Sequence, residues 1–234
     1  MYGESIDVKD ILLFNTMFTG DTKMTTAENL KTGTTTLGIK FKDGVVIASE
    51  RRATMGHMIA HNQVQKVYKI SDNIGMTIAG VVGHAQLMVR YIQSEVALYN
   101  IKKGSNITVN AAATLVSNVI RQGFYLGLIV AGYDNTGGHA YSIDAAGGYI
   151  EDNWVSTGSG SPFAMGVLEG GYKKDLTEKH AIDLAISALN SSIRRDSASG
   201  DGMLISVIDK KGYREIPEEE IRVRAAELGF RYPN

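Results

Sequence analysis

The segment K-T-G-T-T-T-L-G-I, at residues 31–39, places a glycine before three threonines at the start of an apolar pattern. A threonine hydroxyl is a useful nucleophile only when a base lies beside it. One interpretation of the segment is an ordinary glycine turn that enters a threonine-rich strand. The other is a cleavage site between Gly33 and Thr34. Cleavage there would give Thr34 a free α-amine with a pKa of roughly 7.7–8.0, which is a suitable base.

Other polar residues stand in otherwise apolar surroundings and could complete such a site. Glu50 directly follows a predicted strand, Lys66 interrupts an apolar, strand-like run at 64–68, and Asp196 lies where a long predicted helix ends. Taken singly, each is typical of a solvated surface residue, or of a helix terminus with basic residues near its dipole. Their spacing alone therefore assigns them no role.

Several other kinds of site are not supported by the sequence. His57 and His61 have the i, i+4 spacing of a helical zinc pair, but the glutamate of H-E-x-x-H is missing and Gly56 disfavours a helix. Ser159 lies in T-G-S-G-S, which is not the G-x-S-x-G pattern of a nucleophile elbow. We therefore expect no metal site and no cofactor.

The composition is that of a globular α/β chain. Its 234 residues are 44% hydrophobic, which is ample for one domain, and the net charge of -1 favours neither nucleic acid nor an anionic membrane as a partner. The absence of cysteine excludes disulfides and thiol nucleophiles, and is compatible with a reducing compartment. The apolar run 11–14 is too short to span a bilayer, and the residues before it are acidic. We expect neither export nor membrane insertion.

Residues 1–33 show no sustained periodicity, and we expect a leader of weak structure there. From Thr34 onward, alternating and helical patterns follow one another, with turns such as 135–138 between them. The expected strands cover 34–41, 45–48, 74–79, 126–131, 140–144, 150–156 and 203–208, and the expected helices cover 85–99, 109–121, 161–168, 177–193 and 218–228.

This order of elements predicts the fold class. Hairpins dominate the strand blocks, so the sheets should be mainly antiparallel. The helices arrive in pairs and can cover the outer faces of two stacked sheets. We therefore predict an α+β fold, a four-layer α/β/β/α sandwich in one domain.

Several motifs, read together, match one family. The chain resembles the β subunit of the 20S proteasome, and its archaeal type most closely, from Thr34 almost to the C-terminus. The stretches that carry the resemblance are T-G-T-T-T-L-G at 32–38, E-R-R-A-T at 50–54, Q-K-V-Y-K-I at 65–70, M-T-I-A-G at 76–80, S-I-D-A-A-G-G at 142–148, S-T-G-S-G-S-P-F at 156–163 and R-D-S-A-S-G-D-G at 195–202.

The resemblance implies an N-terminal-nucleophile hydrolase, a threonine endopeptidase that processes itself. Residues 1–33 would be a propeptide removed by autocleavage between Gly33 and Thr34, and residues 34–234 would form the hydrolase domain. Thr34 would supply both the nucleophilic hydroxyl and, after cleavage, the basic amine. Glycine at position 33 would permit the strained turn that self-cleavage needs.

The resemblance also implies roles for other residues at matching positions. Lys66 corresponds to the active-site lysine, Glu50 to the acidic residue that fixes it, and Gly80 to the residue whose backbone N–H stabilises the oxyanion. The polar residues expected around the threonine are Ser159, Asp196 and Ser199. The substrate pocket is expected to be lined by Ala53, Val64, Ile78 and Val82. All four are apolar, which predicts cleavage after hydrophobic residues.

The implied partners are identical β subunits in heptameric rings, flanking α-subunit rings, and a regulatory ATPase that delivers unfolded proteins in the cytoplasm. Two alternatives remain. One is an inactive structural ring subunit, which the presence of Thr34, Glu50 and Lys66 disfavours. The other is the related hexameric, ATPase-dependent threonine peptidase of bacteria, which the stretches at 156–163 and 195–202 disfavour.

Overall fold

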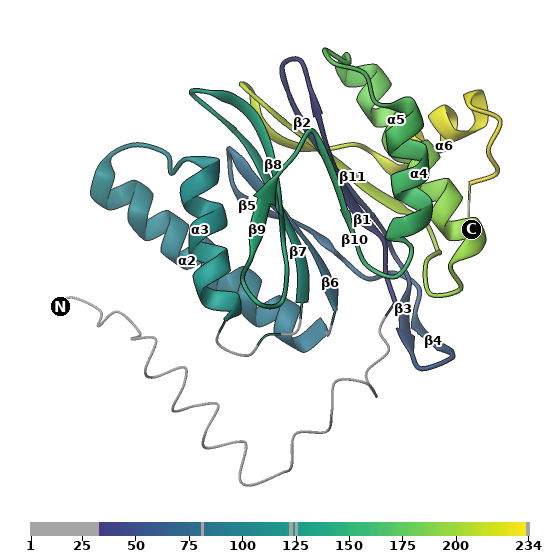
Figure 1. The fold of residues 1–234 in the computed structure, drawn as a ribbon, viewed down its shortest axis with the longest axis horizontal. Coiled ribbons are helices and arrows are strands. Elements are labelled where there is room, and N and C mark those ends of the chain that lie inside the picture. The colour runs from purple at the N-terminus through teal and green to yellow at the C-terminus, as the bar shows by residue number, and fades with distance from the viewer. Residues whose placement is uncertain (1–32, 81, 122–123, 125, 233–234) are drawn as a thin grey trace, which may run out of the picture. The chain divides into compact units, whose positions relative to one another are not determined.

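The computed structural model describes residues 33–80, 82–121, 124 and 126–232 (Figure 1). Of the expected leader, it describes only Gly33, so the prediction of weak structure for residues 1–32 lies outside the described part. Among the described helices, none is both long enough and apolar enough to cross a membrane.

One antiparallel sheet carries the candidate nucleophile beside its first strand. It has five strands in the order β10–β1–β2–β11–β12. Every second side chain of β1 enters a core shared with helices, as the alternation of apolar residues predicts. The strands are β1 (Thr36–Phe41), β2 (Gly44–Glu50), β10 (Trp154–Thr157), β11 (Met203–Asp209) and β12 (Gly212–Glu215).

A second antiparallel sheet of five strands has the order β5–β6–β7–β8–β9. The expected turn at residues 135–138 joins two of them, with Asp134 paired to Gly137. The strands are β5 (Val67–Ser71), β6 (Ile74–Gly80), β7 (Leu126–Asp134), β8 (Gly137–Ile143) and β9 (Tyr149–Glu151).

The two sheets stack face to face around a buried apolar layer that includes Ile47, Val67 and Ile129. The packing is close at Gly75, where an added Cβ would lie 2.5 Å from the Ile47 side chain, so only glycine fits without movement. The sandwich brings the chain just before β1 and the end of β6 to the same edge, where Thr34 and Gly80 line one cavity.

Helices cover both outer faces of the sandwich (Figure 1). Two pack on the β5–β9 sheet and three on the other sheet, each group around its own apolar cluster. The predicted four-layer α+β sandwich is therefore confirmed. The helices are α2 (Val82–Lys103), α3 (Val109–Ile120), α4 (Ser161–Gly171), α5 (Glu178–Arg195) and α6 (Glu218–Glu227).

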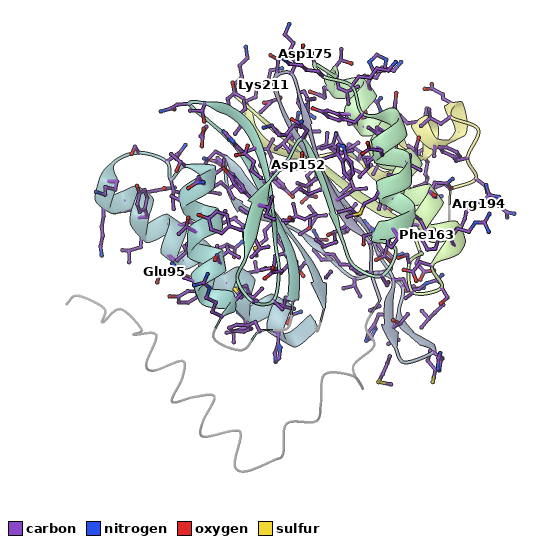
Figure 2. All side chains as sticks on the ribbon, viewed as in Figure 1. Glu95, Asp152, Phe163, Asp175, Arg194 and Lys211 are labelled. Carbon is purple, nitrogen blue, oxygen red and sulfur yellow. The ribbon has the colours of Figure 1, made fainter. Side chains whose placement is uncertain are left out.

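Helix α5 begins and packs as its sequence predicts. The Thr177 hydroxyl accepts a hydrogen bond from the His180 amide and caps the helix. Ile182, Ile186 and Leu189 are buried on one face of the helix. In contrast to these apolar residues, Arg194 near the end of the same helix extends outward and is exposed (Figure 2).

Three parts of the fold differ from the expectation, and the first two concern strand boundaries. The predicted strand 150–156 is two strands in different sheets, because the chain crosses between sheets at Asp152 and Asn153. There the Asp152 amide donates to Ala140 in one sheet, and the Asn153 carbonyl accepts from Lys40 in the other. Lys66 lies just before β5 rather than on a strand.

A short hairpin was not predicted. Strands β3 (Ala53–Met55) and β4 (Met58–His61) pair with each other as a separate two-stranded sheet and turn at Gly56, whose φ is +61°. All of the β4 side chains are exposed, so the hairpin lacks the alternation that marks a half-buried strand. His57 and His61 therefore lie on a hairpin rather than on a helix.

Candidate active site

Thr34 lies two residues before β1, at the edge of the sandwich where β2 ends. The register of β1 and β2 pairs Thr36 with Ser49, so the chain just before β1 runs alongside Glu50. The Glu50 amide accordingly donates to the Thr35 carbonyl at 3.3 Å. Thr34 is buried, with only 4% of its surface exposed. Strand pairing therefore brings a hydroxyl and a carboxylate together at a shielded position.

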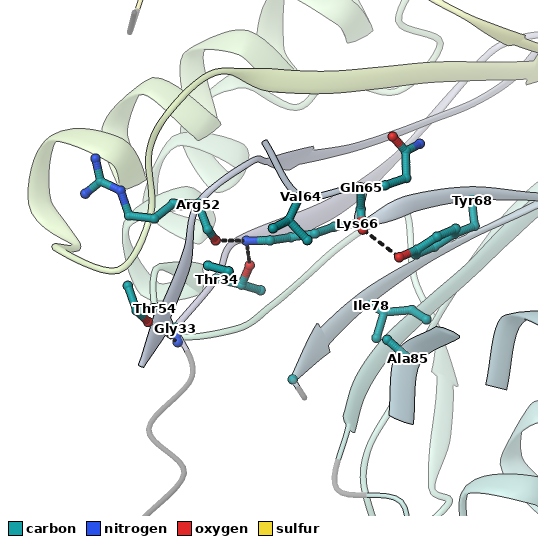
Figure 3. A pocket seen from close by; sticks show the side chains of 12 residues that line it. Gly33, Thr34, Arg52, Thr54, Val64, Gln65, Lys66, Tyr68, Ile78 and Ala85 are labelled. Atoms are coloured by element: carbon teal, nitrogen blue, oxygen red, sulfur yellow. Dashed lines mark hydrogen bonds between the residues drawn. The ribbon is translucent and has the colours of Figure 1, made fainter. Parts of the chain in front are cut away.

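The Thr34 hydroxyl contacts both charged residues that the resemblance implies, and Figure 3 shows its contact with Lys66. Its Oγ1 donates to Glu50 Oε1 at 2.5 Å and accepts from Lys66 Nζ. Lys66 Nζ also donates to Glu50 Oε1 and, at 2.5 Å, to the Arg52 carbonyl. The hydroxyl oxygen thus lies between a carboxylate and an ammonium group.

The Glu50 carboxylate is completely buried and held by backbone donors. Oε1 accepts from the Thr35 amide at 3.2 Å, while Oε2 accepts from the Arg52 amide at 2.7 Å and from the Gly200 amide at 3.0 Å. A buried charge is costly unless it is paired and hydrogen-bonded, and Glu50 has both kinds of partner. Its orientation toward Thr34 is therefore fixed from three segments of the chain.

Lys66 is also shielded from solvent, with 8% of its side chain exposed. Burial lowers the pKa of Lys66 below its ordinary value, because desolvation disfavours the charged form, and the adjacent Glu50 carboxylate opposes this shift. The site thus combines a lysine that loses its proton more readily than usual with a carboxylate that favours the ammonium form.

The predicted polar residues, Ser159, Asp196 and Ser199, lie near the backbone nitrogen of Thr34. Ser159 Oγ accepts from the Thr34 amide at 3.1 Å and donates to Asp196 Oδ2 at 2.6 Å. Asp196 Oδ2 also accepts from Ser199 Oγ at 2.7 Å, and Ser199 Oγ bonds to Thr35 Oγ1 at 2.7 Å. A chain of hydrogen bonds therefore leads from the Thr34 nitrogen to a carboxylate.

Gly33 occupies a position that admits no side chain. An added Cβ would lie 1.8 Å from Ala198 Cβ and 2.9 Å from Ser159 Oγ. The Gly33 amide donates to Thr54 Oγ1 at 3.2 Å, which places Gly33 beside β3. Packing alone therefore requires glycine immediately before Thr34.

A cavity opens next to Thr34 and Lys66 (Figure 3). Three of the four predicted pocket residues line it. Val82 is the first residue of α2, but its side chain lies outside the described part of the structure. Gly80 also lines this cavity, at the end of β6 with φ +145°, a conformation that favours glycine. The predicted residues found here are Ala53, Val64 and Ile78.

The sequence reasoning missed Tyr68 and Ala85, which also line the cavity. Both could have been found from periodicity. Tyr68 lies two residues after Lys66, the spacing of side chains on one face of an extended chain, and Ala85 lies three residues after Val82 on α2. Burial raises the pKa of the Tyr68 phenol, whose O–H donates to the Gln65 carbonyl at 2.6 Å.

Arg52 was also missed as a part of the site, although it lies in the E-R-R-A-T stretch that carries the resemblance. Its backbone contacts both Glu50 and Lys66, and its guanidinium group pairs with Asp201. Within the described residues, no group of three or more histidine, aspartate or glutamate side chains is arranged to hold a metal ion.

Comparison with known proteins gives one consistent result. The family model for proteasome subunits matches residues 30–208. The chain is 53% identical to the proteasome subunit beta of Methanosphaerula palustris over 203 residues, which cover 85% of this chain and 96% of that one. It is 46% identical to the proteasome subunit beta of Thermoplasma acidophilum over 208 residues, which cover 87% of this chain and 98% of that one.

Proposed function

The chain belongs to the proteasome subunit family, and we propose that it is a proteolytic β subunit of the 20S core, a threonine peptidase with Thr34 as its nucleophile. The observation that carries the proposal is the position of the Thr34 hydroxyl, which bonds to both Glu50 and Lys66. An inactive ring subunit would have no need of a hydroxyl held between two buried charges.

In the proposed reaction, Thr34 Oγ attacks the carbonyl carbon of the substrate and its proton passes to the free α-amine. The resulting oxyanion accepts a hydrogen bond from the Gly80 N–H, a kind of interaction that typically contributes about 3–4 kcal/mol to the transition state. The C–N bond breaks, the leaving amine takes up a proton, and water hydrolyses the ester on Thr34. The Lys66 ammonium lowers the cost of charge on Oγ, and Glu50 orients Lys66.

We propose that the same hydroxyl first cuts its own chain. Its Oγ attacks the Gly33 carbonyl carbon, the peptide bond to the Thr34 nitrogen breaks, and the ester that forms is hydrolysed by water. Residues 1–33 leave as a propeptide, and residues 34–234 remain as the hydrolase domain. Before the cut, the Thr34 nitrogen is an amide without basicity, so an uncut chain is inactive as a peptidase. The 2.5 Å contact with Glu50 supplies a proton acceptor at that stage.

After cleavage, the new amine is held by Ser159, which already bonds to the Thr34 nitrogen and to Asp196. Ser199 extends this network to Thr35. The network therefore acts by orienting the base, and a carboxylate nearby favours the protonated amine that forms during attack.

The cavity beside Thr34 supports a preference for hydrophobic residues before the cut bond. Its lining includes the apolar side chains of Ala53, Val64 and Ile78. An apolar side chain gains about 25 cal/mol for each Å² removed from water, whereas a charged one would lose hydration without a partner among these three residues.

The proposed partners are identical β subunits in heptameric rings, flanking α-subunit rings and a regulatory ATPase that supplies unfolded chains in the cytoplasm. The support is the likeness to relatives named proteasome subunit beta, which extends over nearly their whole length. Enclosure in a barrel would protect cellular proteins from a peptidase of broad specificity. A sevenfold ring in electron micrographs is expected, and a sixfold ring would instead favour the related bacterial peptidase.

The experiment that tests the mechanism is the intact mass and N-terminal residue of the assembled protein. We expect a chain that begins at Thr34, and a full-length chain when Thr34 is replaced by alanine. A full-length wild-type chain in an assembled particle that hydrolyses peptides would contradict the mechanism.

A further inference from the structure

The side chain of Arg52 is directed away from the candidate nucleophile and into a two-pronged ion pair. Its Nε donates to Asp201 Oδ2 at 2.7 Å and its Nη2 to Asp201 Oδ1 at 3.1 Å, while Nη1 donates to the Ser197 carbonyl at 2.9 Å. The two side chains are 21% and 15% exposed, so the pair is largely shielded. Such forked pairs fix geometry better than ordinary surface ion pairs do.

The backbone of the same residue lies between the two charges of the site. The Arg52 amide donates to Glu50 Oε2 at 2.7 Å, and the Arg52 carbonyl accepts from Lys66 Nζ at 2.5 Å. A displacement of the Arg52 backbone would therefore affect both the carboxylate and the ammonium group that contact the Thr34 hydroxyl.

Asp201 is the last residue of the segment 196–201, which also contains the site residues Asp196 and Ser199. Asp201 has φ +61°, a left-handed conformation that is uncommon for residues other than glycine, asparagine and aspartate. Its neighbour Gly200 touches the guanidinium group, since an added Cβ would lie 2.4 Å from Arg52 Nη2. The Gly200 carbonyl also accepts from the Arg52 amide at 3.1 Å.

We infer that Arg52 and Asp201 form a positioning pair, which keeps the Glu50–Lys66 side of the site in register with the segment that carries Asp196 and Ser199. This inference rests on the proposed function. Arg52 is a positioning residue, because its guanidinium group contacts Asp201 and Ser197 rather than the reacting hydroxyl. Asp201 acts only through Arg52.

The pair also sets the charge that Lys66 experiences. Lys66 is influenced by the negative charges of Glu50 and Asp196, which raise its pKa, and by the positive charge of Arg52, which lowers it. Asp201 neutralises that guanidinium group. Replacing Asp201 by asparagine therefore leaves the positive charge uncompensated and lowers the pKa of Lys66 further, so the alkaline limb of activity should move to lower pH.

The test compares Asp201→Asn and Arg52→Lys with wild type in assembled, processed particles made from the full chain. A misplacement of about 1 Å typically costs about a hundredfold in rate. We expect kcat to fall by about ten- to a hundredfold in both variants, with KM changed less than twofold, and the alkaline limb of Asp201→Asn to move down. The matched control is Arg51→Met, the neighbouring arginine, whose side chain bonds to Gln63 instead. Its kcat should stay within twofold of wild type.

Unchanged kcat in Asp201→Asn and Arg52→Lys, or an equal loss in Arg51→Met, would overturn the inference. A crystal structure of Asp201→Asn gives a readout that does not depend on activity. We expect the Arg52 carbonyl to move out of hydrogen-bond distance of Lys66 Nζ, and an unmoved carbonyl would also overturn the inference. Particles that carry Thr34→Ala and still hydrolyse peptides would instead refute the proposed function, while the crystal structure would still decide the positioning role.

Discussion

Replacement of Gly33 by alanine should block the cleavage that the proposed mechanism requires. The added Cβ would lie 1.8 Å from Ala198 Cβ, whereas ordinary contact begins at 3.4 Å. The two atoms must therefore separate by about 1.6 Å. The scissile carbonyl belongs to residue 33 itself, so much of that displacement falls on the bond to be cut. A misplacement of about 1 Å commonly costs about a hundredfold in rate, and we expect self-cleavage to slow by at least that factor.

The assay is a time course of intact mass after the full-length chain has assembled, which measures the fraction of chains that begin at Thr34. Ala198→Gly provides a matched rescue, because it removes the atom at 1.8 Å and leaves Ser159 Oγ, at 2.9 Å, as the nearest neighbour. The double variant should therefore recover a large part of the lost rate. Each chain that has been cut should hydrolyse peptides at the wild-type rate, since residue 33 has left.

Cleavage of Gly33→Ala at the wild-type rate would refute the argument that packing against Ala198 positions the scissile bond. Failure of Ala198→Gly to rescue the slow variant would refute it as well. A fully processed Gly33→Ala particle with low peptidase activity would show that residue 33 affects the mature site, which this reasoning does not allow.

Three further predictions concern the mature site. Glu50→Ala leaves the buried Lys66 without its carboxylate, so the free energy of unfolding should fall by about 3–5 kcal/mol. Denaturant titration measures this loss, with Thr34→Ala as the control. A loss below about 1 kcal/mol would contradict the buried pair. Burial lowers the pKa of Lys66, so its ammonium form is lost as the pH rises through that lowered value. Peptide hydrolysis should therefore decline at a pH below the ordinary lysine pKa of 10.5. A rate that stays constant to higher pH would be inconsistent with a required ammonium group. Ile78→Lys places a cation in the cavity and should shift cleavage from hydrophobic toward acidic residues in fluorogenic peptide assays, and an unchanged preference would mean that the pocket is misassigned.

The parts of the fold that the sequence predicted are those with strong local periodicity. Helix α5 is an example, since its cap at Thr177 and its buried face both follow from neighbouring residues. The β3–β4 hairpin was missed because its exposed side chains carry no alternation. The strand 150–156 was joined wrongly, since an apolar pattern does not reveal to which sheet each half of a segment pairs.

For the candidate site, local sequence patterns revealed even less about which residues meet in space. The glycine and threonines at 33–36 stand out locally, because three threonines directly follow a glycine where an apolar pattern begins. Lys66 and Glu50 gained a role only through the resemblance, since each alone is typical of a surface charge. Arg52 and Asp201 are 149 positions apart and meet only through the packing of the loop after α5 against the end of β2. No local pattern could have paired them.

The three amides that hold Glu50 come from Thr35, Arg52 and Gly200, and Gly200 lies 150 positions after Glu50 in the chain. If the loop after α5 has not docked, Glu50 lacks the hydrogen bond from the Gly200 amide. The site then also lacks the side chains of Asp196 and Ser199. The candidate site is therefore complete only after the loop that follows α5 has packed against the end of β2. Under the proposed function, a chain truncated before the loop that follows α5 would have an incomplete site and no hydrolytic activity.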